Sequence, residues 1–83
     1  MRPRADWMQN PGDDQILELF EDSGLILSPG IISANLDLSR SYVTRRIKAL
    51  REHGLVERAN TGRGHHQITE KGLDYISGEI NEV

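Results

Sequence analysis

The sequence predicts one α+β domain that is mainly helical: a three-helix core, a two- or three-stranded β-hairpin and a C-terminal helix. Two observations favour this class. Apolar residues recur at helical spacing in four separate segments, most of which start with a capping residue. Between the third and fourth segments, two short runs flank a glycine-containing turn, which is typical of a hairpin. We expect an arm or a short helix at residues 1–10 and the domain itself at 11–83.

The first helix of the domain is expected over about residues 11–22. Asn10 is a suitable capping residue, and Pro11 has the fixed φ angle that suits the first helical position. Gly24 is placed to end the helix. The buried face is formed by apolar residues at helical spacing, Ile16, Leu19 and Phe20, with Leu17 at its flank.

Two short helices follow, over about 29–35 and 40–53, with only residues 36–38 between them. Ser28 and Ser39 are the expected capping residues, and each stands between apolar residues placed to form a hydrophobic staple. The second of these helices has one apolar stripe at helical spacing: Val43, Ile47 and Leu50. Its opposite face is therefore expected to be exposed.

The pattern then changes to that of a hairpin. The segments 55–58 and 65–68 flank a turn at 60–64, whose glycines tolerate the positive φ that a hairpin tip needs. The apolar run 25–27 is a candidate third strand. A last helix is expected after the capping residue Thr69, with an apolar face made of Leu73, Ile76 and Ile80.

The basic residues are concentrated in one stretch of the chain. The net charge of -3 by itself argues against a nucleic-acid partner. However, residues 39–69 carry seven basic and two acidic side chains, whereas residues 1–38 carry two and seven, and residues 70–83 carry one and four. The seven are Arg40, Arg45, Arg46, Lys48, Arg51, Arg58 and Arg63. This distribution favours a polyanion such as DNA as the partner.

Two short helices joined by three residues form a helix-turn-helix unit, whose second helix can enter the DNA major groove, which is about 12 Å wide. The expected exposed face of helix 40–53 carries hydrogen-bonding and basic residues: Arg40, Ser41, Thr44, Arg45 and Lys48. We expect Arg45 and Arg40 to contact base edges, because arginine can bind guanine through two hydrogen bonds. The other three are expected to share base and phosphate contacts. Arg46 points about 100° away from Arg45 and is expected to contact phosphate or to form an internal salt bridge.

A resemblance to a known family supports this interpretation. The segment LSRSYVTRRIKALREHGLVER from Leu38 to Arg58, a glycine-containing wing, and ITEKG from Ile68 to Gly72 resemble winged helix-turn-helix regulators of archaea and bacteria, in particular small haloarchaeal proteins similar to phage repressors. The resemblance covers about residues 13–77. It implies a transcriptional regulator that binds double-stranded DNA sequence-specifically, and we expect a repressor.

The resemblance also implies which residues make the contacts. The exposed face of helix 40–53 would lie in the major groove, and the wing at 59–65 would reach the backbone or the minor groove. The wing contacts implied are Arg58, Asn60, Thr61 and Arg63.

The histidines do not suggest a metal centre. His65 and His66 are adjacent on an expected strand, so they point to opposite faces and cannot readily share one metal ion. Alternation places His66 on the side of Ile68 as a packing residue, and His65 outward as a candidate phosphate contact. The chain has no cysteine that could add a metal ligand. We expect no cofactor and no small-molecule ligand, because so short a chain leaves little room for an effector pocket.

An enzyme and a membrane protein are both disfavoured. Asp13 and Asp14 are explained by the helix dipole rather than by catalysis, and the two glycines of the turn lack the context of a nucleotide-binding loop. No apolar run approaches the length of a membrane span. The absence of cysteine suits the cytoplasm.

Two further interpretations concern partners. If Trp7 packs against Tyr75 or Ile80, the N-terminal arm and the last helix could form a homodimer surface. The alternative function is a winged-helix protein–protein interaction module without sequence-specific DNA binding. Such a module does not need a basic face on helix 40–53, and this chain has one.

Overall fold

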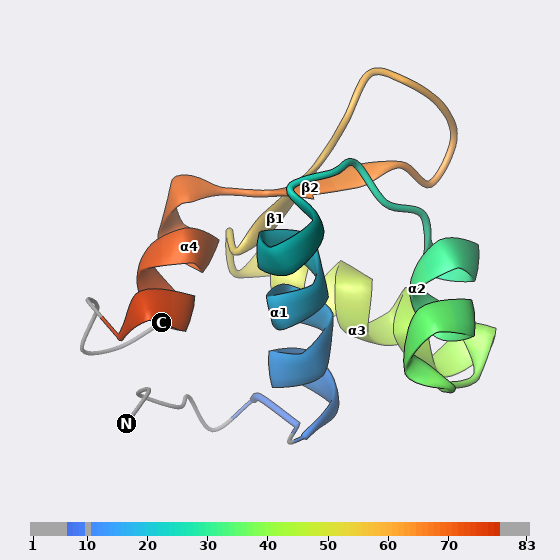
Figure 1. Cartoon of the computed structure of the whole chain (residues 1–83), viewed down its shortest axis with the longest axis horizontal. Helices are drawn as coiled ribbons and strands as arrows, with labels where there is room; N and C mark the ends of the chain where they lie inside the picture. The colour runs from blue at the N-terminus through green and yellow to red at the C-terminus, as the bar shows by residue number, and fades with distance from the viewer. Residues whose placement is uncertain (1–6, 10, 79–83) are drawn as a thin grey trace.

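The computed structural model describes residues 7–9 and 11–78. The elements are α1 (Gly12–Ser23), α2 (Pro29–Leu36), α3 (Arg40–Glu52), β1 (Val56–Arg58), β2 (His66–Ile68) and α4 (Glu70–Ser77). Helices and hairpin follow the predicted order, which confirms the α+β, mainly helical class (Figure 1). Among the described residues, no helix is both long and apolar enough to span a membrane.

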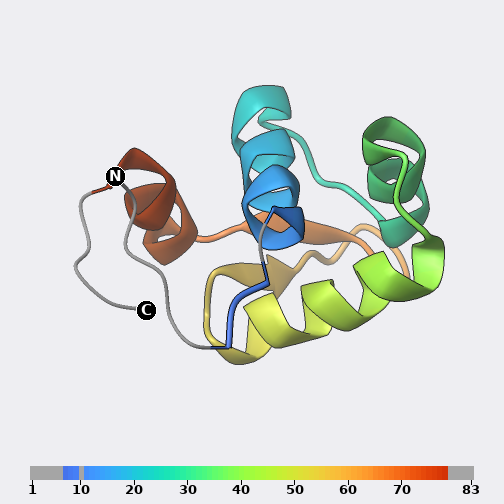
Figure 2. The ribbon, with the colours of Figure 1, turned by 90° about the horizontal axis from the view of Figure 1, so that it is seen from below.

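Helix α1 lies at the centre of the molecule, between α4 on one side and α2 on the other (Figure 1). In Figure 2, α3 runs along the lower side of the molecule, next to the N-terminal end of α1, and the C-terminal end of α1 lies on the upper side. The core consists of apolar side chains from all the helices, from Met8 and Leu27, and from the start of the hairpin. Its members are Met8, Ile16, Leu17, Phe20, Leu27, Ile32, Val43, Ile47, Leu50, Leu55, Val56, Tyr75 and Ile76.

Three of the predicted helix starts are confirmed by their caps. The hydroxyl oxygens of Ser28, Ser39 and Thr69 each accept a hydrogen bond from the backbone N–H three residues later, at 3.3, 3.2 and 3.1 Å. Each bond satisfies one of the amide donors that have no partner within the helix. Helix α1 differs, because Pro11 is its N-cap and provides no side-chain hydrogen bond. Asn10, the predicted cap, lies outside the described residues.

The turn between α2 and α3 is made by residues 37–39, one position later than predicted. Asp37 adopts a left-handed conformation with φ of 55°, which a non-glycine residue seldom does. The backbone N–H of Leu38 then donates to the carbonyl of Ser33 at 3.2 Å and closes the end of α2. This turn directs the chain into α3.

The hairpin strands pair antiparallel, with Val56 opposite Ile68 and Arg58 opposite His66. The predicted third strand is present as a single bridge, in which Leu27 and His66 exchange backbone hydrogen bonds of 2.9 and 2.8 Å. The backbone of His66 is therefore held on one side by β1 and on the other by Leu27.

The prediction for the buried face of α4 was wrong at one position. Leu73 is 42% exposed, whereas Tyr75 is 1% and Ile76 is 6% exposed. The reason is Gly72, which lies against the backbone carbonyl of Leu55 and turns positions 72, 75 and 76 toward the core. Ile80, the third residue predicted for this face, lies outside the described residues.

The aromatic contact of Trp7 also differs from the one considered for a dimer surface. Its ring stacks on His53 at the end of α3, with centroids 3.9 Å apart and planes 5° from parallel. Arg46 donates a further hydrogen bond of 3.1 Å to the carbonyl oxygen of Trp7. The described end of the N-terminal segment is thus attached to α3.

Candidate nucleic-acid interface

The buried stripe of α3 sets the orientation of the helix. Val43, Ile47 and Leu50 are at most 2% exposed, as their spacing predicts. The opposite face carries the five residues predicted to contact DNA, all of them exposed: Arg40, Ser41, Thr44, Arg45 and Lys48. The thirteen residues of α3 span about 20 Å, long enough to follow a major groove.

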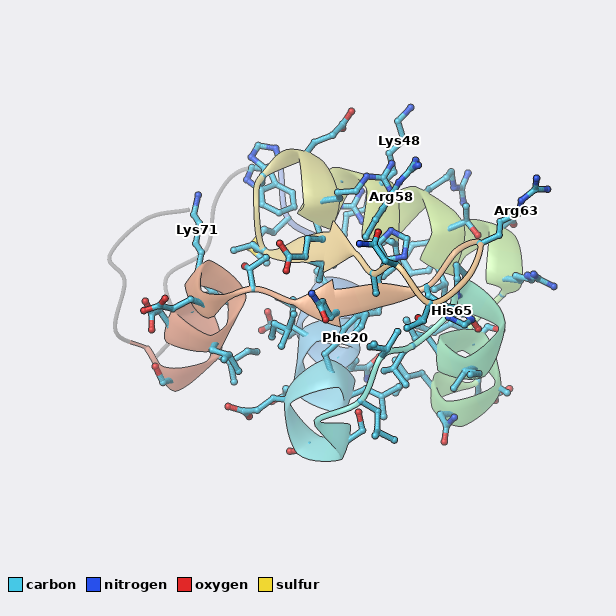
Figure 3. The ribbon with its side chains drawn as sticks, turned by 90° about the horizontal axis from the view of Figure 1, so that it is seen from above. Phe20, Lys48, Arg58, Arg63, His65 and Lys71 are labelled. Carbon is cyan, nitrogen blue, oxygen red and sulfur yellow. The ribbon has the colours of Figure 1, made fainter. Side chains whose placement is uncertain are left out.

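A groove of about 670 Å³ lies between α3 and the wing, residues 59–65. We call it the α3–wing groove. Its lining is Pro29, Thr44, Arg45, Ile47, Lys48, Arg51, Arg58, Ala59, Asn60, Gly62, Arg63, Gly64, His65 and His66. Figure 3 shows Lys48 and Arg58 projecting to the same side of the molecule, with Arg63 at the outer end of the wing. The groove is thus formed by segments that are apart in the sequence.

The charges of the α3–wing groove have one sign. Five of its lining residues are arginine or lysine, and none of the described residues that line it is acidic. Within residues 7–9 and 11–78, Arg45, Lys48, Arg58 and Arg63 form no ion pair with an acidic side chain. Their positive charge is therefore available to an anion from solution.

The wing is closed by its own hydrogen bonds. The N–H of Ala59 donates to the carbonyl of His65 at 2.9 Å, and the N–H of His65 donates to the carbonyl of Gly62 at 3.2 Å. The ring of His65 is hydrogen-bonded to the hydroxyl of Thr61 at 2.8 Å and lies where a side chain on Gly62 would be. His65 is consequently half-buried and orders the wing as well as lining the groove.

Seven of the ten residues predicted to contact DNA line the α3–wing groove: Thr44, Arg45, Lys48, Arg58, Asn60, Arg63 and His65. The other three, Arg40, Ser41 and Thr61, are exposed but do not line it. Arg40 lies beside α2, where its guanidinium carbon would be 3.8 Å from a Cβ added to Gly30. It therefore lies at the N-terminal end of α3, outside the α3–wing groove.

Seven groove residues were not among the predicted contacts, and two of them, Arg51 and His66, have ionisable side chains. Arg51 follows Thr44 and Lys48 at helical spacing, so the three side chains lie on one side of α3. This spacing could have identified Arg51 from the sequence. His66 is 4% exposed, which confirms its predicted burial, but it also hydrogen-bonds Arg51 at 2.9 Å. Burial lowers the pKa of His66, the nearby cations Arg51 and Arg58 lower it further, and the hydrogen bond to Gly64 opposes this shift.

The alternatives for Arg46 are resolved in favour of the internal salt bridge. Its guanidinium is paired with the fully buried Asp13 at 2.8 Å, on the side of α3 that faces α1. This carboxylate raises the pKa of Arg46. Arg46 is thus part of the fold rather than of the DNA-facing surface.

Among residues 7–9 and 11–78, acidic and histidine side chains do not assemble into a metal centre. In the part of the chain that the structure describes, no three such residues come together in a way that could hold an ion. The more buried of the two histidines that line the groove, His66, bonds Arg51 and the carbonyl of Gly64 instead.

Comparison with known proteins assigns the family. A model of the winged helix-turn-helix phage repressor family matches residues 1–82. The PhiH1 repressor-like protein from Haloarcula marismortui is similar in structure, with a TM-score of 0.80 and 33% identity over 98% of this chain and 90% of that one. A search of curated proteins gave no match.

More distant likenesses show the same fold. A MarR family protein from Bacillus stearothermophilus has a TM-score of 0.74 at 23% identity, over 87% of this chain and 51% of that one. ZitR from Lactococcus lactis, solved in complex with DNA, has a TM-score of 0.66 at 22% identity, over 95% and 56%. The present chain thus spans about half the length of these two proteins.

These matches, together with the basic groove, establish a DNA-binding transcription regulator and not an enzyme. The winged helix and its order of elements are those that the sequence predicts. The chain belongs to the winged helix-turn-helix phage repressor family.

Proposed function

We propose that this protein is a transcriptional repressor that recognises a specific double-stranded DNA sequence. The observation that carries the proposal is the α3–wing groove, whose cations come from both α3 and the hairpin and whose described lining contains no acid. Double-stranded DNA carries one negative charge per about 1.7 Å of helix axis. Counterions released from that surface would supply most of the salt-sensitive affinity.

In this proposal, α3 enters the major groove. Arg45 and Arg40 contact base edges, and Ser41, Thr44 and Lys48 share base and phosphate contacts. The wing lies on the backbone or in the minor groove through Arg58, Asn60, Thr61, Arg63 and His65. Residues 11–83 would form the DNA-binding domain, and residues 1–10 an arm or a short helix. The groove geometry supports these roles because seven of the ten residues line one surface.

We also propose that the protein acts in the cytoplasm as a homodimer joined through α4, although Trp7 of the N-terminal arm packs on His53 and not on α4. Support comes from Leu73, which leaves an apolar side chain 42% exposed on α4. Two copies of α3 related by a two-fold axis would lie in successive major grooves, about 34–36 Å apart. Sedimentation of the wild type and of Leu73→Glu tests this surface, and a wild type that stays monomeric at all concentrations contradicts it.

A chemical-shift titration with duplex DNA at two salt concentrations tests the DNA-binding proposal. We expect the largest shifts in α3 and the wing, and weaker binding at the higher salt concentration. Shifts confined to α1 and α4 would place the interface elsewhere. An absence of any response to several duplexes would favour the protein–protein interaction module.

A further inference from the structure

Arg51, in the last turn of α3, and His66, in β2, meet at the α3–wing groove. The guanidinium nitrogen Nη1 of Arg51 lies 2.9 Å from Nε2 of His66. Both residues line the groove. We propose that Arg51 is a further DNA phosphate contact and that His66 is the positioning residue that holds its guanidinium for this contact. This inference rests on the proposed DNA-binding function.

The hydrogen bonds of His66 fix which ring nitrogen carries the proton. Nδ1 lies 2.9 Å from the carbonyl oxygen of Gly64, which can only accept, so Nδ1 must donate. In the neutral ring Nε2 then has a free lone pair and can only accept, and the donor it faces is Arg51. The arrangement therefore has one direction: Arg51 donates to His66, and His66 donates to Gly64.

His66, which accepts the hydrogen bond from Arg51, is held rigidly. The ring of His66 belongs to a residue that is 4% exposed. Its backbone pairs with Arg58 on one side and with Leu27 on the other. An arginine side chain loses rotamer entropy when it becomes ordered. Because His66 orders Arg51 before any ligand arrives, less of that cost remains to be met on binding.

The remaining donors of Arg51 can bind an anionic acceptor from outside the protein. Guanidinium has five N–H donors, and the bond to His66 uses one of them. Within the described residues, Arg51 makes no ion pair, although Glu52 is its neighbour in sequence. Lys48 and Arg58 line the same groove, so an acceptor there would be attracted by several cations. A phosphate oxygen of the DNA backbone has the charge and the hydrogen-bonding geometry required.

The hydrogen bonds from Arg51 to His66 and from His66 to Gly64 also link the two parts of the interface. Arg51 belongs to the helix that we place in the major groove, and Gly64 belongs to the wing. The competing explanation is a purely structural role, in which these hydrogen bonds only hold the wing against α3. The two differ in the salt dependence of DNA binding, because only a phosphate contact changes the number of counterions released.

The experiment measures affinity for a mixed-sequence duplex of about 20 base pairs, or two helical turns, across a series of salt concentrations. The proteins are the wild type, Arg51→Ala, His66→Leu, the double variant that combines these two changes, His66→Gln and, as a known wing position, Arg63→Ala. Lys71→Gln is the matched control, since it removes a basic side chain that does not line the groove. Thermal unfolding of every variant provides a separate measure of folding.

We expect Arg51→Ala to reduce the slope of log K against log salt by about 0.9, the value for one phosphate. His66→Leu should weaken binding when Arg51 is present and add nothing in the Arg51→Ala background. His66→Gln should restore binding, because its amide has one donor side for Gly64 and one acceptor for Arg51. Lys71→Gln should keep the wild-type slope.

An unchanged slope in a folded Arg51→Ala protein would overturn the inference, as would equal losses from His66→Leu in both backgrounds. If Arg63→Ala lowers the slope while Arg51→Ala does not, this inference fails and the proposed function stands. If the wild type binds no duplex at any salt concentration, the proposed function itself fails.

Discussion

Arg46 of α3 donates two hydrogen bonds, each 2.8 Å long, from Nε and Nη2 to the two carboxylate oxygens of Asp13 in α1. Asp13 has no exposed surface, and the side chain of Arg46 is 11% exposed. The same carboxylate accepts the backbone N–H of Gln9 at 3.1 Å, just before α1. The pair therefore joins α1 to the side of α3 that faces away from the α3–wing groove.

Removing one partner of this pair should be costly. Asp13→Asn would leave the guanidinium of Arg46 buried without a counter-charge, and we expect it to lower the free energy of unfolding by about 3–5 kcal/mol. Urea denaturation measures the loss. Asp22→Asn is the matched control, because Asp22 is an exposed acid in the same helix and should change stability by less than about 0.5 kcal/mol. Similar small effects from both variants would show that the pair contributes little.

The features that the sequence predicted well are local ones. The caps at Ser28, Ser39 and Thr69 depend on residues three positions apart, and the stripe of α3 depends on positions three or four apart. The hairpin depends on a few residues around one turn. In each case the cause lies within one or two helical turns of chain, so the pattern can be seen in the sequence itself.

The features that were missed depend on contacts between distant segments. Arg46 could have faced phosphate or protein, and its choice is made by Asp13, which is 33 positions away. The rotation of α4 is set by Gly72 against the backbone of Leu55, and spacing within α4 alone gave the wrong face for Leu73. Arg51 is ordered by a histidine on another element. Such choices follow from tertiary packing, which periodicity does not contain.

Gly72 provides a second stability prediction. A Cβ at this position would overlap the carbonyl oxygen of Leu55 and would lie 2.7 Å from Cγ1 of Ile68. Backbone cannot yield as a flexible side chain can, so Gly72→Ala should lower the free energy of unfolding by about 1–3 kcal/mol. Thermal or urea unfolding provides the measurement. In Gly30→Ala the new atom would meet nothing nearer than 3.8 Å, so this control should be neutral or up to about 1 kcal/mol more stable.

His66 should make stability depend on pH. Its pKa is lowered in the folded protein, chiefly by burial, so the unfolded chain binds more protons once the pH falls below the ordinary histidine pKa of about 6.5. Folding stability should therefore be fully present above that pH and decrease as the pH falls below it, by at most about 1.4 kcal/mol per pH unit. Urea unfolding between pH 5 and pH 8, a range of about three units centred on that value, measures the slope.

The His66→Gln protein should have a flatter stability profile, because it has no ring to protonate at this site. His65→Gln is the control, and it should keep most of the wild-type slope, because burial, the largest cause of the lowered pKa of His66, is unchanged. If His66→Gln retained the full slope, another group would be responsible for it.

Arg45 and Arg63 should affect DNA binding in different ways. Arg45 lies on the exposed face of α3, where a guanidinium can bind a guanine edge through two hydrogen bonds, and Arg63 lies at the end of the wing (Figure 3). Arg45→Ala should weaken binding to the preferred sequence by about 1–3 kcal/mol and relax the preference at one base pair. Arg63→Ala should weaken binding to all duplexes more evenly and lower the salt slope by about one.

Selection of binding sites from a random pool, followed by titration of the best and of a scrambled duplex, measures both effects. If each variant lost affinity equally for both duplexes, α3 would not be the element that distinguishes sequences, because loss of a base contact must depend on the base that is present.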